Sequence, residues 1–234
     1  MRGLLYKEFV VMKSWIRLLL FVQIVVSVTC LFTANLYGIG NETFMLHGMC
    51  YFLMFFMTGT MNAEVFRNDE NPLWQCFVGS TPQSFKGQVQ SKYYIILIVN
   101  LVVLFAEFVT DCAVVLLLND VGASAISIIY VIFCLIIIGN AIELPFLVRF
   151  GSANGLNIKL CMMVLVPTMI GIYALFGDIS MFMEEDYLTV FEKIFSTATA
   201  AWIQALLPFV AILFYYGSYR LSLKLYRKGA EMNE

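Results

Sequence analysis

The sequence predicts an all-α membrane protein with six helices across the bilayer and both chain ends on one side. Of the 234 residues, 61% are hydrophobic and 13% are charged, and the mean hydropathy is +0.85. Soluble domains carry about twice that share of charged residues. The two other observations are six long apolar runs and a one-sided distribution of Lys and Arg. Together they exclude an ordinary soluble enzyme or binding domain.

A short amphipathic helix is expected before the first span, over residues 1–17. Its apolar side chains recur at helical spacing, at Leu5, Phe9, Met12 and Ile16. A helix of this kind lies flat in the membrane interface. The same stretch is also compatible with a simple positive flank that only assists insertion.

Six apolar runs are expected to span the membrane, because a bilayer core about 30 Å thick needs roughly 20 apolar residues in a helix. The runs are 18–37, 44–66, 93–118, 123–148, 160–176 and 198–216. The fifth run is the shortest. Lys159 lies at its inner end, and its long side chain can extend to the headgroups.

The Lys and Arg residues give the orientation. With six spans, thirteen of the fourteen lie on the side that holds both termini, and only Lys193 lies opposite. Loops rich in Lys and Arg stay in the cytoplasm, so both termini are expected inside. Five or seven spans would divide these basic residues between the two sides.

The segment 67–92 is the only long inner connection that the six spans leave. It begins with an Asn-Pro pair that favours a helix start, and it then places apolar side chains on one face, at Leu73, Trp74 and Phe77. An aromatic face of this kind suits docking into a groove on another protein. Alternatively, Trp74 is an interfacial anchor among the headgroups.

Polar residues inside the third expected span are the other functional signal. Glu107 and Asp111 are four residues apart, and Asn100 precedes Glu107 by seven, so all three share a helix face. Burying an Asp at mid-bilayer costs roughly 2.5–3.5 kcal/mol on insertion scales. The stripe therefore lines either a path for cationic substrate groups or a polar contact between helices, for example with His47.

Several motifs, taken in order, resemble those of the permease subunits of type-2 ABC transporters. They are Leu4-Leu5-Tyr6-Lys7-Glu8-Phe9 near the N-terminus, then Asp69-Glu70, Trp74, Ser80-Thr81-Pro82 and Lys92, and finally Pro145-Phe146 with Arg149-Phe150-Gly151. The resemblance covers nearly the whole chain. Within the family, the chain is similar to the short permeases of bacterial peptide exporters, including the phenol-soluble-modulin exporters.

This resemblance implies one transmembrane permease domain over residues 1–234, located in the bacterial cytoplasmic membrane. It implies a second permease copy, a cytoplasmic ABC ATPase that holds ATP and Mg²⁺, and a peptide substrate, but no nucleic acid. Segment 67–92 would be the coupling helix, with ATPase contacts at Asp69, Glu70, Leu73, Trp74 and Phe77. The interfacial helix and the spans would contact membrane lipid.

Other classes of function fit less well. The chain has no GxxxxGK[ST] phosphate-binding loop, so its energy must come from a partner or an ion gradient. No HExxH or GxSxG motif points to an intramembrane enzyme, and no catalytic, cofactor-binding or metal-ligating residue is predicted. A secondary carrier or channel that uses Glu107 and Asp111 as a cation or proton site is the main alternative, although the internal repeats expected of a carrier are not evident.

Overall fold

The computed structural model describes residues 2–38, 40–67, 69, 84–118, 124–176 and 198–231. These residues form helices and contain no strand. The helices are α1 (Arg2–Val11), α2 (Lys13–Tyr37), α3 (Asn41–Arg67), α5 (Ser84–Leu118), α6 (Ile126–Phe176) and α9 (Ala198–Glu231).

Five helical stretches of the described chain are long and apolar enough to cross a membrane. They are Lys13–Tyr37, Thr43–Arg67, Lys86–Leu118, Ile126–Ser152 and Gln204–Leu225. They coincide with five of the six expected runs, so the expectation of an all-α membrane protein is confirmed. The remaining run, 160–176, is helical and forms the last part of α6, but most of its side chains lie outside the described set.

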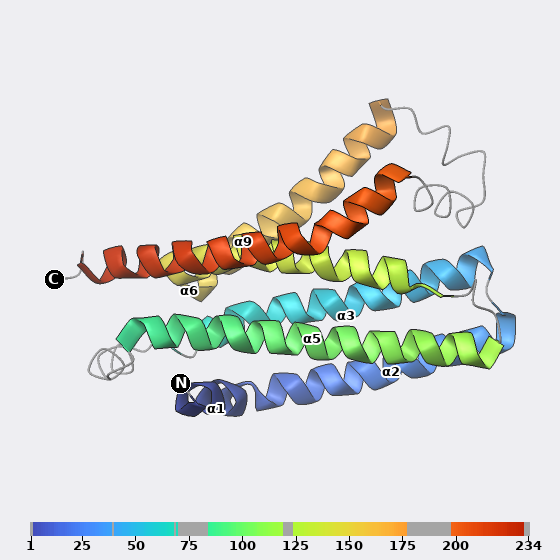
Figure 1. Cartoon of the computed structure of the whole chain (residues 1–234), viewed down its shortest axis with the longest axis horizontal. Helices are drawn as coiled ribbons and strands as arrows, with labels where there is room; N and C mark the ends of the chain where they lie inside the picture. The colour runs from blue at the N-terminus through green and yellow to red at the C-terminus, as the bar shows by residue number, and fades with distance from the viewer. Residues whose placement is uncertain are drawn as a thin grey trace.

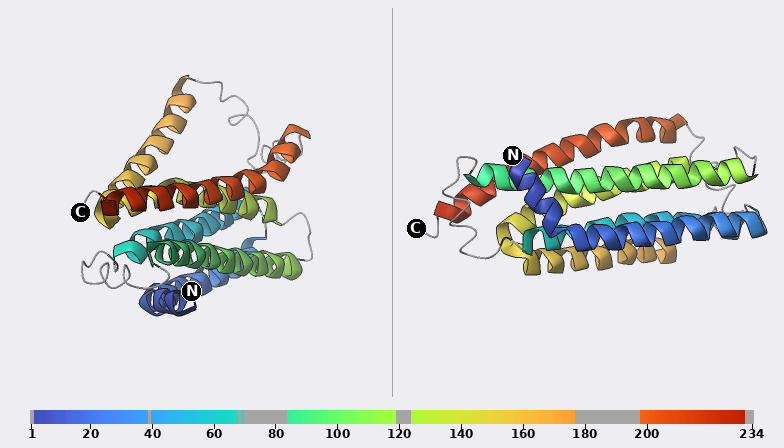
Figure 2. Two further views of the ribbon diagram at one scale, coloured as in Figure 1. Left: turned by 60° about the vertical axis from the view of Figure 1, so that its left-hand side comes forward. Right: turned by 90° about the horizontal axis from the view of Figure 1, so that it is seen from below.

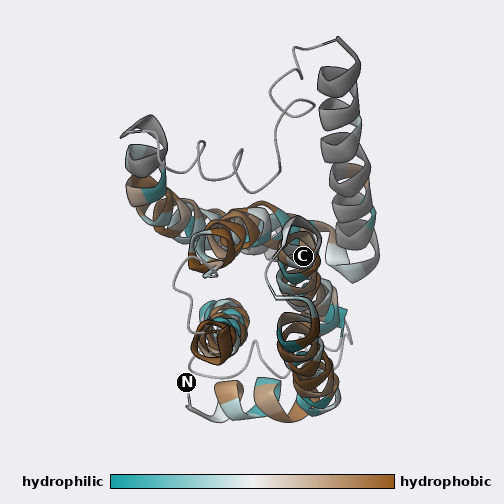
Figure 3. Cartoon of the chain, turned by 90° about the vertical axis from the view of Figure 1, so that its right-hand side faces the viewer, coloured by the Kyte–Doolittle hydropathy of each residue, from teal (hydrophilic) through white to brown (hydrophobic). Residues whose placement is uncertain are grey.

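The long helices run side by side, whereas α1 lies across one end of the bundle (Figures 1 and 3). Seen from below, α1 crosses the ends of α2 and α5, and it packs against both (Figure 2). The single helix expected over residues 1–17 is instead two helices. The chain turns at Met12, and residues 13–17 already belong to α2.

Two glycines change the direction of the chain. Gly38 ends α2 with φ 66° and donates its N–H to the Ala34 carbonyl at 3.0 Å, in the left-handed conformation that glycine adopts without strain. Gly151 has φ 80° and ψ 175° and breaks α6, which bends there (Figure 1). The fourth and fifth expected runs leave residues 149–159 as a loop between them. In the structure these residues are helical, and the chain bends at Gly151 alone.

The bundle has apolar side chains on its outside as well as inside. Phe21, Phe105 and Leu213 are between 66% and 70% exposed, on three different helices. Brown, hydrophobic residues accordingly make up much of the long helices (Figure 3). A soluble protein rarely exposes so much contiguous apolar surface, whereas lipid tails solvate it.

Candidate functional site

A buried cluster of four charged side chains lies where α1 crosses the bundle. Lys92 Nζ on α5 is 2.8 Å from Asp69 Oδ2 and 3.9 Å from Glu8 Oε1. Lys7 Nζ is 3.2 Å from Glu8 Oε1 and also pairs with Asp69 Oδ1. Gln88 donates its amide N–H to Asp69 Oδ2 at 2.9 Å. We call Lys7, Glu8, Asp69 and Lys92 the inner ion cluster, because they lie at the end of the bundle that the sequence predicts to face the cytoplasm. The cluster contains two ammonium groups and two carboxyl groups.

Lys92 is the centre of the inner ion cluster, with a side chain only 3% exposed. Besides its two carboxylates, its ammonium group donates to the backbone carbonyl of Val65 and lies 4.7 Å from the centroid of the Phe66 ring. Val65 is in the last turn of α3, where carbonyl groups lack helical partners and the helix dipole favours a cation. The position therefore satisfies a buried ammonium group from several directions.

The two carboxyl groups of the inner ion cluster respond differently to burial. Burial acts to raise the pKa of Asp69, but the charges of Lys92 and the hydrogen bonds from Lys7, Lys92 and Gln88 outweigh it, so this pKa lies below its ordinary value. Burial dominates at Glu8 and raises its pKa, despite the attraction of Lys92 and Lys7. Asp69 is therefore the firmly ionised partner of the lysines.

The inner ion cluster includes residues from both ends of the expected coupling segment, 67–92, and we call these ends its roots. Asp69 lies just before the part of the chain that the structure does not describe, and α5 resumes at Ser84, one turn before Gln88. Asp69 is thus placed, with its carboxylate tied to α1 and α5. The other expected ATPase contacts, Glu70, Leu73, Trp74 and Phe77, lie outside the described residues.

Two residues of the expected polar stripe have structural partners. Asn100 is fully buried, accepts a hydrogen bond from the Thr58 hydroxyl at 2.9 Å and donates to the Ile96 carbonyl at 2.8 Å. Asp111 is 2% exposed and accepts from the Ser124 hydroxyl at 2.7 Å and the Ala125 N–H at 2.9 Å. Asn100 therefore joins α5 to α3, and Asp111 fixes the start of α6.

Glu107 differs from its neighbours on the stripe. It is fully buried, and neither of its carboxyl oxygens has a hydrogen-bond partner. The Gln23 amide of α2 faces it, and the Gln23 carbonyl oxygen is also without a partner. Among the described residues, no ion pair includes Glu107. A buried carboxyl group in this setting is held at least cost as a neutral acid.

A further polar cluster joins α3 to α6, and spacing along the chain could not show that Asn62 meets Asn140 and Glu143. The Asn62 amide donates to Asn140 Oδ1 at 2.8 Å and to Glu143 Oε2 at 3.0 Å. All three residues are at least 93% buried. The available signals were the three-residue spacing of Asn140 and Glu143 in the fourth expected span and the position of Asn62 four residues after Thr58.

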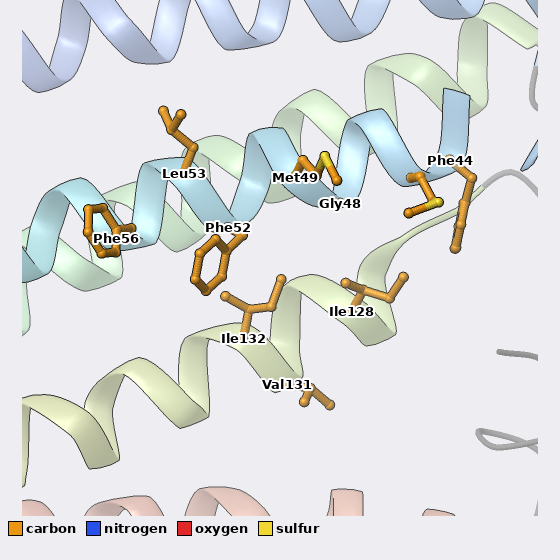
Figure 4. A pocket seen from close by; sticks show the side chains of 10 residues that line it. Phe44, Gly48, Met49, Phe52, Leu53, Phe56, Ile128, Val131 and Ile132 are labelled. Atoms are coloured by element: carbon orange, nitrogen blue, oxygen red, sulfur yellow. The ribbon is translucent and has the colours of Figure 1, made fainter. Parts of the chain in front are cut away.

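The outer halves of α3 and α6 enclose an apolar groove of about 590 Å³ (Figure 4). Its lining is entirely apolar or glycine: Phe44, Met45, Gly48, Met49, Phe52, Leu53, Phe56, Ile128, Val131 and Ile132. The α3 residues extend over twelve positions, or about 18 Å of helix. That length is similar to one leaflet of a bilayer core about 30 Å thick.

A family model described as ABC-2 family transporter protein matches residues 3–227. The chain belongs to the ABC-2 transporter family. It matches none of the curated proteins and none of the solved structures with which it was compared.

Family membership makes the protein the membrane permease subunit of an ABC transporter, and its apolar helices make it a multi-pass membrane protein. The family implies an ABC ATPase subunit as partner. The permease itself is a transport subunit, not a catalytic one. Within the residues that the structure describes, no group of three or more His, Cys, Asp or Glu side chains is arranged to hold a metal ion.

Proposed function

We propose that the permease exports amphipathic peptides from the bacterial cytoplasm, with both termini inside. ATP and Mg²⁺ would be bound by a separate ATPase that docks on segment 67–92. The observation that supports this proposal is the inner ion cluster, which ties the roots of that segment to α1 and α5. The similarity of the sequence to peptide-exporter permeases supports the cargo class.

The inner ion cluster suits transmission of movement from the ATPase. A displacement of Asp69 acts on α1 through Lys7 and on α5 through Lys92. Separating one partner from a buried ion pair leaves an uncompensated charge, which costs about 3–5 kcal/mol. The helices are therefore expected to move together with the root of the segment instead of breaking the pairs.

A double variant of the segment tests the docking role. Trp74→Ala with Phe77→Ala removes the proposed aromatic anchor, and each side chain contributes about 2–4 kcal/mol if it is a binding hot spot. We expect the ATPase to be lost when the complex is purified through the permease. Trp202→Ala with Phe209→Ala is a matched control, since these aromatics on α9 are 71% and 65% exposed. Full retention of ATPase and of cargo-stimulated ATP hydrolysis in the segment variant would refute the docking role.

The functional unit is proposed to contain a second permease, because few polar groups of one copy are available to line a path. Asn100, Glu107 and Asp111 are all buried inside a single copy. They would contact cargo only if α2 and α3 separate from α5 during transport. Native mass measurement in lipid is expected to show two permeases with two ATPases. A stable, active complex with a single permease would contradict this.

The apolar groove between α3 and α6 is a candidate contact for the apolar side of the cargo. Methionines at a binding surface adapt to varied partners, and Met45 and Met49 lie at the exposed side of the groove. Gly48 lies in its lining, and a Cβ added there meets no atom within 4 Å. The position therefore has room for a side chain, and Gly48→Leu places one in the groove.

Gly48→Leu is expected to reduce peptide efflux several-fold while the permease still assembles with the ATPase. Gly139→Leu is the matched control, because a Cβ at Gly139 on α6 also meets nothing within 4 Å and Gly139 does not line the groove. Equal efflux from both variants and the parent would place the groove outside the transport path.

A further inference from the structure

The outward face of α1 carries exposed apolar side chains. Tyr6, Phe9 and Val10 are 72%, 53% and 50% exposed. Because α1 lies across the ends of the spans, this face runs along the membrane surface and not through the bilayer (Figure 3). Large apolar side chains on such a helix enter the boundary between headgroups and acyl chains.

Exposed cations follow this face in the chain, and no acid is exposed within residues 2–38. Lys13 and Arg17 are both exposed in the first turns of α2. Glu8 is the only Asp or Glu among residues 1–41, and it is fully buried in the inner ion cluster. Its burial leaves a surface of apolar and basic side chains, which is complementary to negatively charged headgroups.

The opposite side of α1 contacts Asp69 and Lys92, which lie near the two ends of segment 67–92. Lys7 and Glu8 are adjacent to Tyr6 and Phe9 in sequence, and they hold Asp69 and Lys92 from within. One face of α1 therefore contacts the membrane surface, and the other contacts the root of segment 67–92. Binding of α1 to the bilayer restricts its movement and so also stabilises the inner ion cluster.

We propose that α1 and the start of α2 bind anionic phospholipid headgroups, and that this binding supports coupling to the ATPase. The second part rests on the proposed function, whereas the lipid site does not. Each basic residue near an anionic surface strengthens association by roughly fivefold, so Lys13 and Arg17 together would contribute about 25-fold. Salt is expected to weaken the effect, because the Debye length falls to about 3 Å at 1 M.

The test uses the permease–ATPase complex in nanodiscs of phosphatidylcholine alone or mixed with phosphatidylglycerol. We expect phosphatidylglycerol to raise the thermal unfolding midpoint of the permease and its cargo-stimulated ATP hydrolysis. Lys13→Gln with Arg17→Gln should lose most of both gains, whereas Lys13→Arg with Arg17→Lys should keep them. Arg220→Gln with Lys224→Gln is the matched control, since these exposed cations on α9 have the same four-residue spacing.

The readouts separate the two parts of the proposal. The unfolding midpoint reports the lipid site without requiring transport or coupling. No gain from phosphatidylglycerol in the parent, or an equal loss in the α9 control, would overturn the lipid site at α1. A gain in the midpoint with no change in ATP hydrolysis would support the lipid site and overturn its link to coupling.

Discussion

The inner ion cluster and the outer half of α5 both bury two carboxyl groups, but they satisfy them differently. At the inner end, Glu8 and Asp69 lie against the ammonium groups of Lys7 and Lys92. Farther along α5, Asp111 relies on a hydroxyl and a backbone N–H, and Glu107 has no hydrogen-bond partner. The carboxyl groups of the inner ion cluster are stabilised by opposite charges, whereas Asp111 is stabilised only by neutral hydrogen-bond donors.

The difference follows from which residues the two membrane faces receive. Six spans would place thirteen of the fourteen Lys and Arg on the inner side, because positive loops are retained in the cytoplasm. Glu8 and Asp69 contact lysines at the end of the bundle where α1 lies, whereas no ion pair among the described residues includes Glu107 or Asp111. A buried pair of opposite charges can transmit a displacement, whereas a neutral carboxyl group can part from its neighbours at less cost.

Removing the central cation should have the largest effect on this comparison. Lys92→Met keeps the length of the side chain but leaves Asp69 and Glu8 with only one of the two ammonium groups that they share, that of Lys7. Loss of one partner from a buried ion pair costs about 3–5 kcal/mol. We expect a clear fall in the thermal unfolding midpoint and in cargo-stimulated ATP hydrolysis.

Lys86→Met is the matched control, because Lys86 is exposed on the same helix six residues earlier. It should behave like the parent. If Lys92→Met proved as stable and as active as Lys86→Met, the inner ion cluster would be neither a structural nor a coupling element, and the contrast between the two regions would fail.

The sequence predicted the spans well because run length and hydropathy are local properties. Five expected runs coincide with helices long enough to cross a membrane. The N-terminal helix was predicted too long, since nothing in the apolar spacing marks the turn at Met12. A break between the fourth and fifth runs was expected, and Gly151 lies within it, but the sequence did not show that a single glycine with positive φ makes the bend without a loop.

The candidate site was only partly predictable. Lys7, Asp69 and Lys92 stand in short motifs that the sequence analysis singled out, but their contact depends on the angle at which α1 crosses the bundle. Lys7 and Asp69 are 62 positions apart, and no helical periodicity reaches that far. Conversely, the expectation that Glu107 and Asp111 share a buried helix face was correct. Spacing alone could not reveal that Asp111 has hydrogen-bond partners and Glu107 has none.

A smaller effect is expected from neutralising one acid of the inner ion cluster. Asp69→Asn keeps an acceptor for Gln88, and Lys92 retains Glu8. Because the folded pKa of Asp69 is lowered, its stabilising contribution is fully present above its unfolded pKa of about 3.9 and is lost as the pH falls through the folded value. The parent should be more stable than Asp69→Asn at neutral pH, and the gap should close only in strong acid.

Glu8→Gln should show the opposite trend, since burial raises the folded pKa of Glu8. Its contribution is fully present below an unfolded pKa of about 4.3 and declines as the pH rises through the folded value. Unfolding midpoints of the parent and both variants across the pH range test this. Parallel pH profiles for Asp69→Asn and Glu8→Gln would show that the pKa values of the two carboxyl groups are not shifted in opposite directions.

The smallest effects should come from the outer half of α5. There, replacing each carboxyl group by the amide of the same shape tests Glu107 and Asp111 separately. Asp111→Asn replaces an acceptor of two hydrogen bonds and should lower the free energy of unfolding by about 1–2 kcal/mol. Glu107→Gln removes no hydrogen bond or ion pair and should leave stability close to that of the parent. Peptide efflux from both variants then separates a structural role from a role in transport.

Loss of efflux in Glu107→Gln at unchanged stability would place this carboxyl group on the transport path. A large loss of stability would instead show that Glu107 is held by a partner as a carboxylate, and the distinction drawn here between the two ends of the bundle would collapse.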